Sequence, residues 1–303
     1  MRSFVLFVAL LAGSLIVAAA LTYPAWLLVS LVSVEPVHRV MNRVAMLIAL
    51  IGLVVLTRRL GLSNREAAGY GLPRSEFLRQ LVFGWLCGLG LMLPLVALLI
   101  GLGIRTPRPD IDGSLLLIIG GGIVSGLVVA FIEETFFRGV LFSAVARSSG
   151  ALAAVLAPSL LYAALHFLGG KLRVPADEVS WIHGFAVLGR LLERYADPLT
   201  FADSFLALAV LGMLLALVRL RTGAIAACIG LHAAGVGTIA VLRASTHVDT
   251  ASDYAVLAGS YDGVIGWAAL AWFATITLAY RMAGRRSAVA RAQPDDTGER
   301  GSR

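Results

Sequence analysis

The chain has 303 residues, of which 59% are hydrophobic and 14% are charged. A soluble domain averages about 25% charged residues and must cover its surface with polar groups, so this composition excludes a soluble protein. The net charge is +7, and the basic residues gather between the apolar runs. That pattern is typical of membrane topology signals, so we expect a lipid bilayer around the chain and no nucleic-acid partner.

The apolar runs predict an all-α fold, a polytopic transmembrane helix bundle of about eight spans, since a helix of about 20 apolar residues crosses a bilayer core. In chain order the predicted spans are Phe4–Val34, Val44–Thr57, Leu81–Ile104, Ser114–Phe137, Ala151–Leu168, Ser204–Val218, Gly223–Leu242 and Gly263–Tyr280. The start of the first span resembles a secretory signal peptide. Its apolar run resumes at Ala25, however, which favours an uncleaved span.

Polar segments divide the chain into four regions. Residues 1–113 are predicted to hold N-terminal transmembrane helices with an interfacial segment at Gly61–Gln80, which is expected to form a helix along the membrane surface. Residues 114–242 hold the motifs considered below, and residues 243–282 hold the last span. Residues 283–303 are predicted to be a disordered cytoplasmic tail. A further helix is expected at the outer surface, at Val179–Leu192.

The distribution of basic residues predicts the orientation in the membrane. If the N-terminus is inside, 16 of the 25 Lys and Arg residues fall in inner segments and 9 in outer segments. Because inner loops of membrane proteins carry the excess of Lys and Arg, both termini are predicted to be cytoplasmic. The strong preference for Arg over Lys indicates a bacterial source, and hence the bacterial inner membrane.

Four ionisable side chains lie inside predicted spans, where such groups are rare. Glu133 and Glu134 are adjacent in the fourth span, His166 is in the fifth and His232 is in the seventh. An ionisable group at the centre of a bilayer costs about 2.5–3.5 kcal/mol on insertion scales, so it normally faces an interior site. Two Glu and two His on three separate spans therefore predict a functional site.

The spacing of these residues predicts that they meet. The turn between the fourth and fifth spans is expected at Ser148–Gly150, because Gly and Ser interrupt helices there. Glu133 precedes Ser149 by sixteen residues and His166 follows Gly150 by sixteen, so each lies about 24 Å from the turn. An antiparallel helix hairpin then brings Glu133 and His166 to the same depth.

Neighbouring residues suggest supporting roles. Glu134 and Arg138 are four residues apart, which permits an ion pair on one helix face. That pairing leaves Glu133 about 100° away around the helix, free to face the site. Tyr162 shares a face with His166, where it would orient the imidazole, contact substrate or serve only packing.

Three short motifs carry a resemblance to a known family. The run Phe131–Gly139 resembles the Glu-Glu-x-x-x-Arg motif of the CPBP family, the CAAX prenyl protease and bacteriocin-processing intramembrane proteases, also called the Abi family. Tyr162–His166 resembles the family's second motif, Phe-x-x-x-His, with Tyr in place of Phe. Arg221–Ile225, followed by Ile229–His232, resembles its third motif.

The resemblance implies an intramembrane endopeptidase that acts on a membrane protein or peptide, with Glu133, His166 and His232 as its catalytic residues. Two arrangements of these residues stay open. In one, Glu133 is a desolvated general base that activates a water with the help of the histidines. In the other, the three residues bind Zn²⁺ as in a metalloprotease, although no His-Glu-x-x-His motif is present to favour it.

One departure from the third motif bears on activity. The family's motif often ends in His-x-x-x-Asn, whose Asn helps to bind the oxyanion, whereas Val236 follows His232 at that spacing here. Thr238 and the backbone near Gly235 and Gly237 are alternative donors. Since loss of one oxyanion donor costs about 10²–10³ in turnover, a slow or inactive member is an alternative expectation.

Two other classes of protein account for the same residues. A non-catalytic membrane scaffold or immunity protein on this fold would tolerate Val236. A proton-coupled transporter would also place Glu and His within the membrane, but the internal repeats typical of transporters are not evident. A serine hydrolase is disfavoured because the sequence has no Gly-x-Ser-x-Gly motif.

Overall fold

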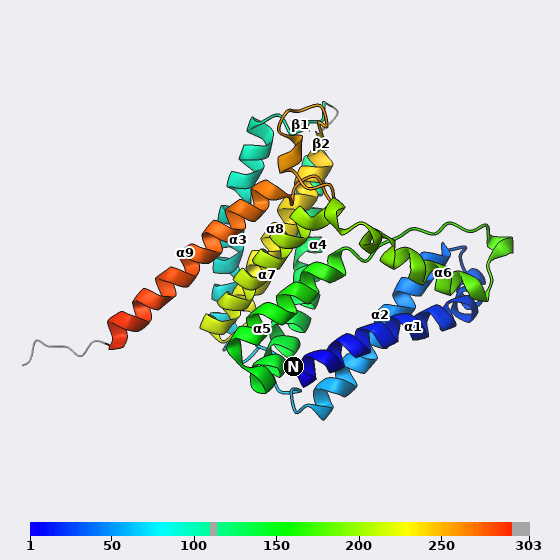
Figure 1. Ribbon diagram of the computed structural model, residues 1–303, viewed down its shortest axis with the longest axis horizontal. Coiled ribbons are helices and arrows are strands. Elements are labelled where there is room, and N and C mark those ends of the chain that lie inside the picture. The colour runs from blue at the N-terminus through cyan, green and yellow to red at the C-terminus, as the bar shows by residue number, and fades with distance from the viewer. Residues whose placement is uncertain (110–113, 293–303) are drawn as a thin grey trace, which may run out of the picture.

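The computed structural model describes residues 1–109 and 114–292 and confirms the predicted all-α membrane bundle. Its α-helices are α1 Arg2–Ser30, α2 Val37–Arg59, α3 Arg74–Gly101, α4 Leu115–Glu134, α5 Phe142–His166, α6 Trp181–Leu192, α7 Ala202–Thr222, α8 Ala226–Ser245 and α9 Trp267–Ala292. A π-helix, η1 (Thr135–Leu141), joins α4 to α5. Two short strands, β1 (Arg105–Pro107) and β2 (Thr246–Val248), pair antiparallel above the ends of α3 and α8 (Figure 1).

The long helices correspond to the eight predicted spans in order. Six stretches of the described residues are long and apolar enough to cross a membrane. One of them, Leu115–His166, contains both the fourth and the fifth predicted spans. The eighth predicted span is α9, which is long enough but is not among these six stretches.

The chain reverses direction between the fourth and fifth spans where the sequence predicts it. Gly150 has φ 83° and ψ 173°. This backbone conformation interrupts the helix, and residues with a Cβ rarely adopt it. Residues 142–149 therefore complete the descent from α4, and residues 151–166 run back through the bundle (Figure 1).

Helix α8 lies at the centre of the bundle, with α3 and α4 packed against it (Figure 1). Small residues allow this close approach. A Cβ on Gly126 of α4 would lie 2.5 Å from the carbonyl oxygen of Ala233 of α8, which is too close for a side chain. Gly122 similarly faces Gly237. Gly122 and Gly126, one turn apart on α4, therefore form a packing surface against α8, as such spacing in membrane helices favours.

Helices α1, α2 and α6 form a separate layer that leans away from the rest of the bundle (Figure 1). They share their own cluster of buried apolar residues, which includes Ala19, Met41 and Val187. The helix expected near Val179–Leu192 is present as α6, and Gly184 lets it cross α1 against Ala19.

Two segments differ from the sequence expectations. Residues 61–73 of the predicted interfacial segment Gly61–Gln80 form turns, and α3 begins at Arg74. Glycines and Pro73 break helices there, and Asn64 accepts the backbone N–H of Ala67 at 2.7 Å, which stabilises a turn instead. Residues 283–292, predicted to be disordered, continue α9, because their Ala and Arg residues are good helix formers. The remaining tail, residues 293–303, lies outside the described residues.

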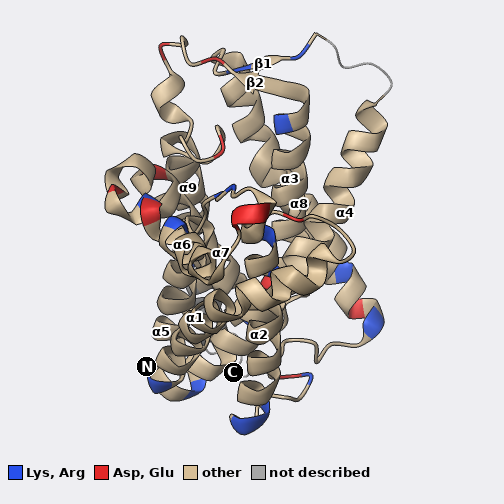
Figure 2. Cartoon of the chain, turned by 90° about the vertical axis from the view of Figure 1, so that its right-hand side faces the viewer, with Lys and Arg blue, Asp and Glu red and all other residues tan. Residues whose placement is uncertain are grey.

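Charged residues gather at the two ends of the bundle and in its loops, and the middle of the helices is nearly free of them (Figure 2). The Arg distribution predicts that both termini are cytoplasmic, so a topology reporter fused after Arg147 is expected to read cytoplasmic and one fused after Val174 external. Reporter activity in intact and permeabilised cells measures this. A cytoplasmic signal after Val174 would contradict the orientation.

Candidate active site

The site begins where α4 changes into the π-helix η1. Glu134, the last residue of α4, is fully buried, and its Oε1 accepts a hydrogen bond of 2.9 Å from Nη1 of Arg138. The predicted i, i+4 ion pair therefore forms. Arg138 is also buried, and its Nη2 donates to the carbonyl of Gly212 on α7 at 3.2 Å. π-helical turns are rare and often lie at functional sites, as this one does.

Glu134 also holds a histidine from the centre of the bundle. Its Oε1 lies 2.7 Å from Nδ1 of His232 on α8. Because the carboxylate is paired with Arg138 and can only accept, Nδ1 of His232 carries the donated proton. A neutral His232 then presents the lone pair of Nε2 on its other side, where Oε2 of Glu133 lies 3.8 Å away.

His166 is oriented in the same way by its own helix. Its Nδ1 lies 2.8 Å from the carbonyl oxygen of Tyr162, one turn earlier on α5. A carbonyl only accepts, so Nδ1 of His166 donates, and Nε2 is the free ring nitrogen. Both imidazoles are thus oriented in the same way: a buried oxygen accepts a hydrogen bond from Nδ1, and Nε2 is free to contact a water or a substrate.

The two neighbouring glutamates differ in their access to the cavity. The side chain of Glu133 is 30% exposed, whereas that of Glu134 is 0% exposed. Among the described residues, no group hydrogen-bonds Oε2 of Glu133, although that oxygen is buried. Glu133 is therefore the carboxylate that a substrate or a water can reach, and Glu134 is held in the protein.

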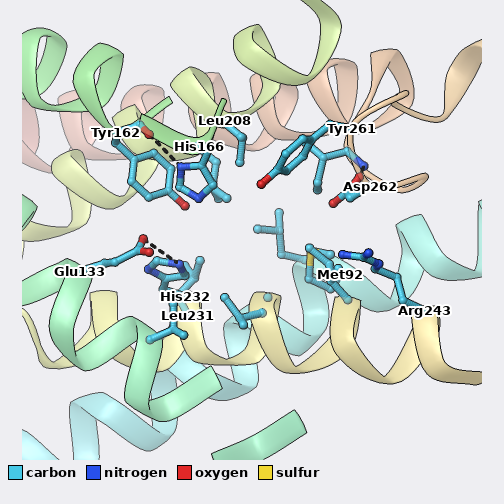
Figure 3. Close-up of a pocket in the computed structure, with 17 residues that line it drawn as sticks. Met92, Glu133, Tyr162, His166, Leu208, Leu231, His232, Arg243, Tyr261 and Asp262 are labelled. Atoms are coloured by element: carbon cyan, nitrogen blue, oxygen red, sulfur yellow. Dashed lines mark hydrogen bonds and ion pairs between the residues drawn. The ribbon is translucent and has the colours of Figure 1, made fainter. Parts of the chain in front are cut away.

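A cavity of about 240 Å³ opens between α3, α4, α5, α7 and α8. Figure 3 shows Glu133, His166 and His232 gathered at one end of it, with Tyr162 beside them. The structure thus brings together the three side chains that the sequence singled out. The middle of the cavity is apolar and is lined by Leu91, Met92, Leu208, Leu211, Leu231, Val236, Ile239 and Ile265.

The opposite end of the cavity is polar and was not anticipated from the sequence. Arg243, at the end of α8, and Tyr261 and Asp262, in the loop before α9, face it there (Figure 3). Burial raises the pKa of the Asp262 carboxyl, against hydrogen bonds from the backbone of Ile265 and Val264 that lower it. Burial also raises the pKa of Tyr261, so its hydroxyl stays protonated at neutral pH.

A larger groove of about 790 Å³ meets the cavity at the same catalytic end. Its walls come from α1, α2, the end of α4, η1 and α5, and it also reaches Glu133, Tyr162 and His166. Most of its lining is aliphatic or aromatic: Leu10, Leu11, Met46, Leu47, Leu50, Leu53, Phe131, Ile132, Phe136, Phe137, Leu165 and Leu168. The reactive groups therefore lie at the junction of a wide apolar groove and a narrower cavity.

A zinc site would need Glu133, His166 and His232 to converge on one point. Within residues 1–109 and 114–292, no group of three or more His, Cys, Asp and Glu side chains is arranged to hold a metal ion. In this geometry Glu133, His166 and His232 are therefore not arranged as a three-ligand set. Metal dependence itself stays a separate prediction of the family resemblance.

None of the alternative oxyanion donors suggested by the sequence offers a free N–H or O–H to the catalytic end of the cavity. Val236 lines the cavity one turn after His232, where it offers no donor. Thr238 and Gly237 line a different groove, between α3 and α4, and so face away from the catalytic end. Gly235 does line the cavity. Its N–H belongs to the interior of α8, however, where backbone donors are used by the helix itself.

The comparison with known families agrees with the site. Residues 115–238 match the family model of the type II CAAX prenyl endopeptidase Rce1-like proteins. No curated protein and no solved structure matches the chain. The matched segment runs from α4 into α8 and contains Glu133, Glu134, His166 and His232. Residues 115–238 are therefore similar to the Rce1-like proteins of the CPBP family, the family that the three motifs resemble.

Proposed function

We propose that this protein is an intramembrane endopeptidase that hydrolyses a peptide bond of a membrane-associated protein or peptide with a water activated by Glu133. The matched family supports an endopeptidase of the CAAX type in general. The observation that carries the specific proposal is the meeting of Glu133, His166 and His232 in one cavity inside the bundle, with each imidazole held at Nδ1.

The first step activates the water. Glu133 accepts a proton as the water oxygen bonds to the carbonyl carbon of the substrate, and the carbonyl oxygen becomes an oxyanion. His166 orients this water, because its Nε2 accepts the second hydrogen of the water while its Nδ1 stays bonded to Tyr162. Glu133 suits this role because it is reachable from the cavity and, among the described residues, no Lys or Arg is paired with it; its nearest partner is the neutral imidazole of His232.

The second step breaks the peptide bond. The proton on Glu133 passes to Nε2 of His232, 3.8 Å away, and then to the leaving nitrogen as the carbon–nitrogen bond breaks. Glu134 stabilises the imidazolium formed in between, because it accepts from Nδ1. The products are a carboxylic acid and an amine, which together contain all atoms of the water and the amide. Glu133 and His232 return to their starting protonation states.

The substrate is proposed to enter from the membrane. The groove between α1, α2 and α5 is apolar and ends at the catalytic groups, so a lipid-embedded or apolar segment fits it. We place the protein in the bacterial inner membrane, with both termini in the cytoplasm, on the distribution of its Arg residues.

Peptide cleavage by the purified protein tests this proposal. A panel of membrane-associated peptides, with and without a lipid-modified cysteine, is incubated with protein in detergent or liposomes, and new termini are identified by mass spectrometry. We expect cleavage at one position in at least one peptide. No cleavage of any peptide would instead favour the non-catalytic scaffold, and proton flux into liposomes the transporter.

His166→Gln and His232→Gln are each expected to lower kcat by about 10²–10⁴-fold, as is usual when a group that handles protons is lost. The matched control is His247→Gln, since His247 lies on β2 outside the cavity and hydrogen-bonds Thr106. kcat is measured on the peptide found above. Activity within a factor of three of the unmodified protein in both His166→Gln and His232→Gln would contradict the mechanism.

A further inference from the structure

Amide hydrolysis at this site needs a donor for the oxyanion, and few groups at the catalytic end can supply one. Neutral His166 and neutral His232 each use their ring proton on Nδ1, so Nε2 of each is an acceptor. Val236 has no polar side-chain atom, and Arg138 is committed to Glu134 and Gly212. Among the described side chains that line this end of the cavity, the remaining one with a proton to donate is Tyr162, through its hydroxyl.

The Tyr162 hydroxyl is free and faces the cavity. Figure 3 shows it pointing from α5 into the space between the catalytic groups and the apolar middle of the cavity. No group within the described part of the chain hydrogen-bonds this hydroxyl, whereas the backbone carbonyl of the same residue holds His166. A buried tyrosine normally finds a partner for its O–H, so an unpartnered one that faces a reactive site calls for a ligand.

The ring of Tyr162 is held rigidly. It is 2% exposed, and the guanidinium carbon of Arg138 lies 4.6 Å from its centroid. The imidazoles of His166 and His232 meet it edge to face, with ring centroids 4.4 Å and 5.9 Å away. Phe137 packs on it at 5.3 Å. A donor fixed on all sides before the reaction needs no reorganisation when negative charge develops, which is the condition for effective oxyanion stabilisation.

We propose that Tyr162 is a catalytic residue whose hydroxyl donates a hydrogen bond to the oxyanion of the tetrahedral intermediate. This assignment rests on the proposed endopeptidase function and adds one group to it. Tyr261 is the other hydroxyl on the cavity, but it stands in a loop at the opposite end and is 37% exposed. Tyr162 is the better donor because it touches both imidazoles and is fixed by them.

The assignment also explains the two departures from the family motifs. This chain has Tyr at residue 162, where the second motif has Phe, and Val at residue 236, where the third motif often has Asn. Both side chains line the same cavity. The donor absent from α8 is thus supplied from α5, and the loss of Asn does not by itself make the site inactive.

The test is Tyr162→Phe, which removes one oxygen and keeps the ring contacts. We expect kcat to fall by about 10²–10³-fold, as for loss of one oxyanion donor, while KM changes less than about threefold. Adding Val236→Asn to Tyr162→Phe is expected to raise kcat at least about tenfold above that of Tyr162→Phe alone, since it places an amide donor one turn after His232. Tyr280→Phe, on α9 beside Arg221, is the matched control and leaves kcat unchanged.

A binding measurement separates catalysis from packing. A peptidyl phosphonate with a tetrahedral anionic centre should bind Tyr162→Phe more weakly by a factor similar to the loss in kcat. Unchanged kcat in Tyr162→Phe, or a loss confined to Tyr261→Phe, would overturn the assignment. A fall in kcat with unchanged phosphonate affinity and no rescue by Val236→Asn would also overturn it. Inactivity of the unmodified protein would overturn the proposed function together with this inference, whereas an active Tyr162→Phe beside inactive histidine variants would overturn this inference alone.

Discussion

Glu133→Gln is expected to abolish measurable peptide cleavage, with kcat lower by about 10²–10⁴-fold or more, and to leave the protein folded in the membrane. Glutamine has nearly the same volume and still accepts hydrogen bonds, but it cannot take a proton from water. Folding should be unaffected, because Glu133 is partly exposed to the cavity and Arg138 is paired with Glu134 instead. The measurement is cleavage by detergent-purified protein, normalised to the monodisperse fraction.

The control for Glu133→Gln is Glu178→Gln. Glu178 ends the short 3-10 helix after Pro175, in the loop between α5 and α6, and does not line the catalytic cavity. Its substitution should leave kcat and yield unchanged. Full activity in Glu133→Gln would rule out the carboxylate as the base. Loss of folded protein in Glu133→Gln would contradict the separation of roles between the two neighbouring glutamates.

Glu134→Gln and Arg138→Met are each expected to destabilise the folded protein by about 3–5 kcal/mol, because either change leaves a buried charge without its partner. The pair lies inside the bundle, where the side chain of Glu134 is 0% exposed and that of Arg138 is 1% exposed. Solvent therefore cannot stabilise either charge when its partner is removed. The double variant should be more stable than either single variant, since it buries no lone charge. Glu134→Gln should also lose activity, because Glu134 orients His232.

Thermal unfolding in detergent and the yield of monodisperse protein measure these effects. Arg190→Met is the matched control, since Arg190 at the end of α6 pairs with Glu193 at 2.6 Å in an exposed position. Exposed ion pairs contribute little, so Arg190→Met should not change the unfolding midpoint measurably. If Arg138→Met were as stable as this control, the buried pair would have no structural role.

The sequence predicted most of the helical arrangement, because the cost of placing polar groups in lipid is large and local. Apolar runs identified the spans, and Gly150 marked the reversal that brings α5 back beside α4. The i, i+4 spacing predicted the Glu134–Arg138 pair, since it depends only on one helix. The equal distances of Glu133 and His166 from the turn predicted that both would reach one cavity.

The features that the sequence did not predict depend on contacts between segments that are distant in the chain. Glu134 and His232 are 98 residues apart, and no local pattern encodes their hydrogen bond. The π-helix of η1 has the composition of an ordinary helix, so periodicity did not reveal it. Tyr261 and Arg243 reach the cavity from elements packed at its far end, and their positions follow from tertiary packing.

The reactive groups and one wall of the apolar groove come from different parts of the chain. Glu133, Tyr162, His166 and His232 all lie within residues 115–238, whereas α1 and α2 supply one wall of the groove. Selection can therefore reshape the groove by changing the N-terminal hairpin while the chemistry stays fixed. An exchange of residues 1–60 between homologous chains would be expected to transfer substrate preference without transferring catalysis, which makes the hairpin a natural unit for diversification and for engineering.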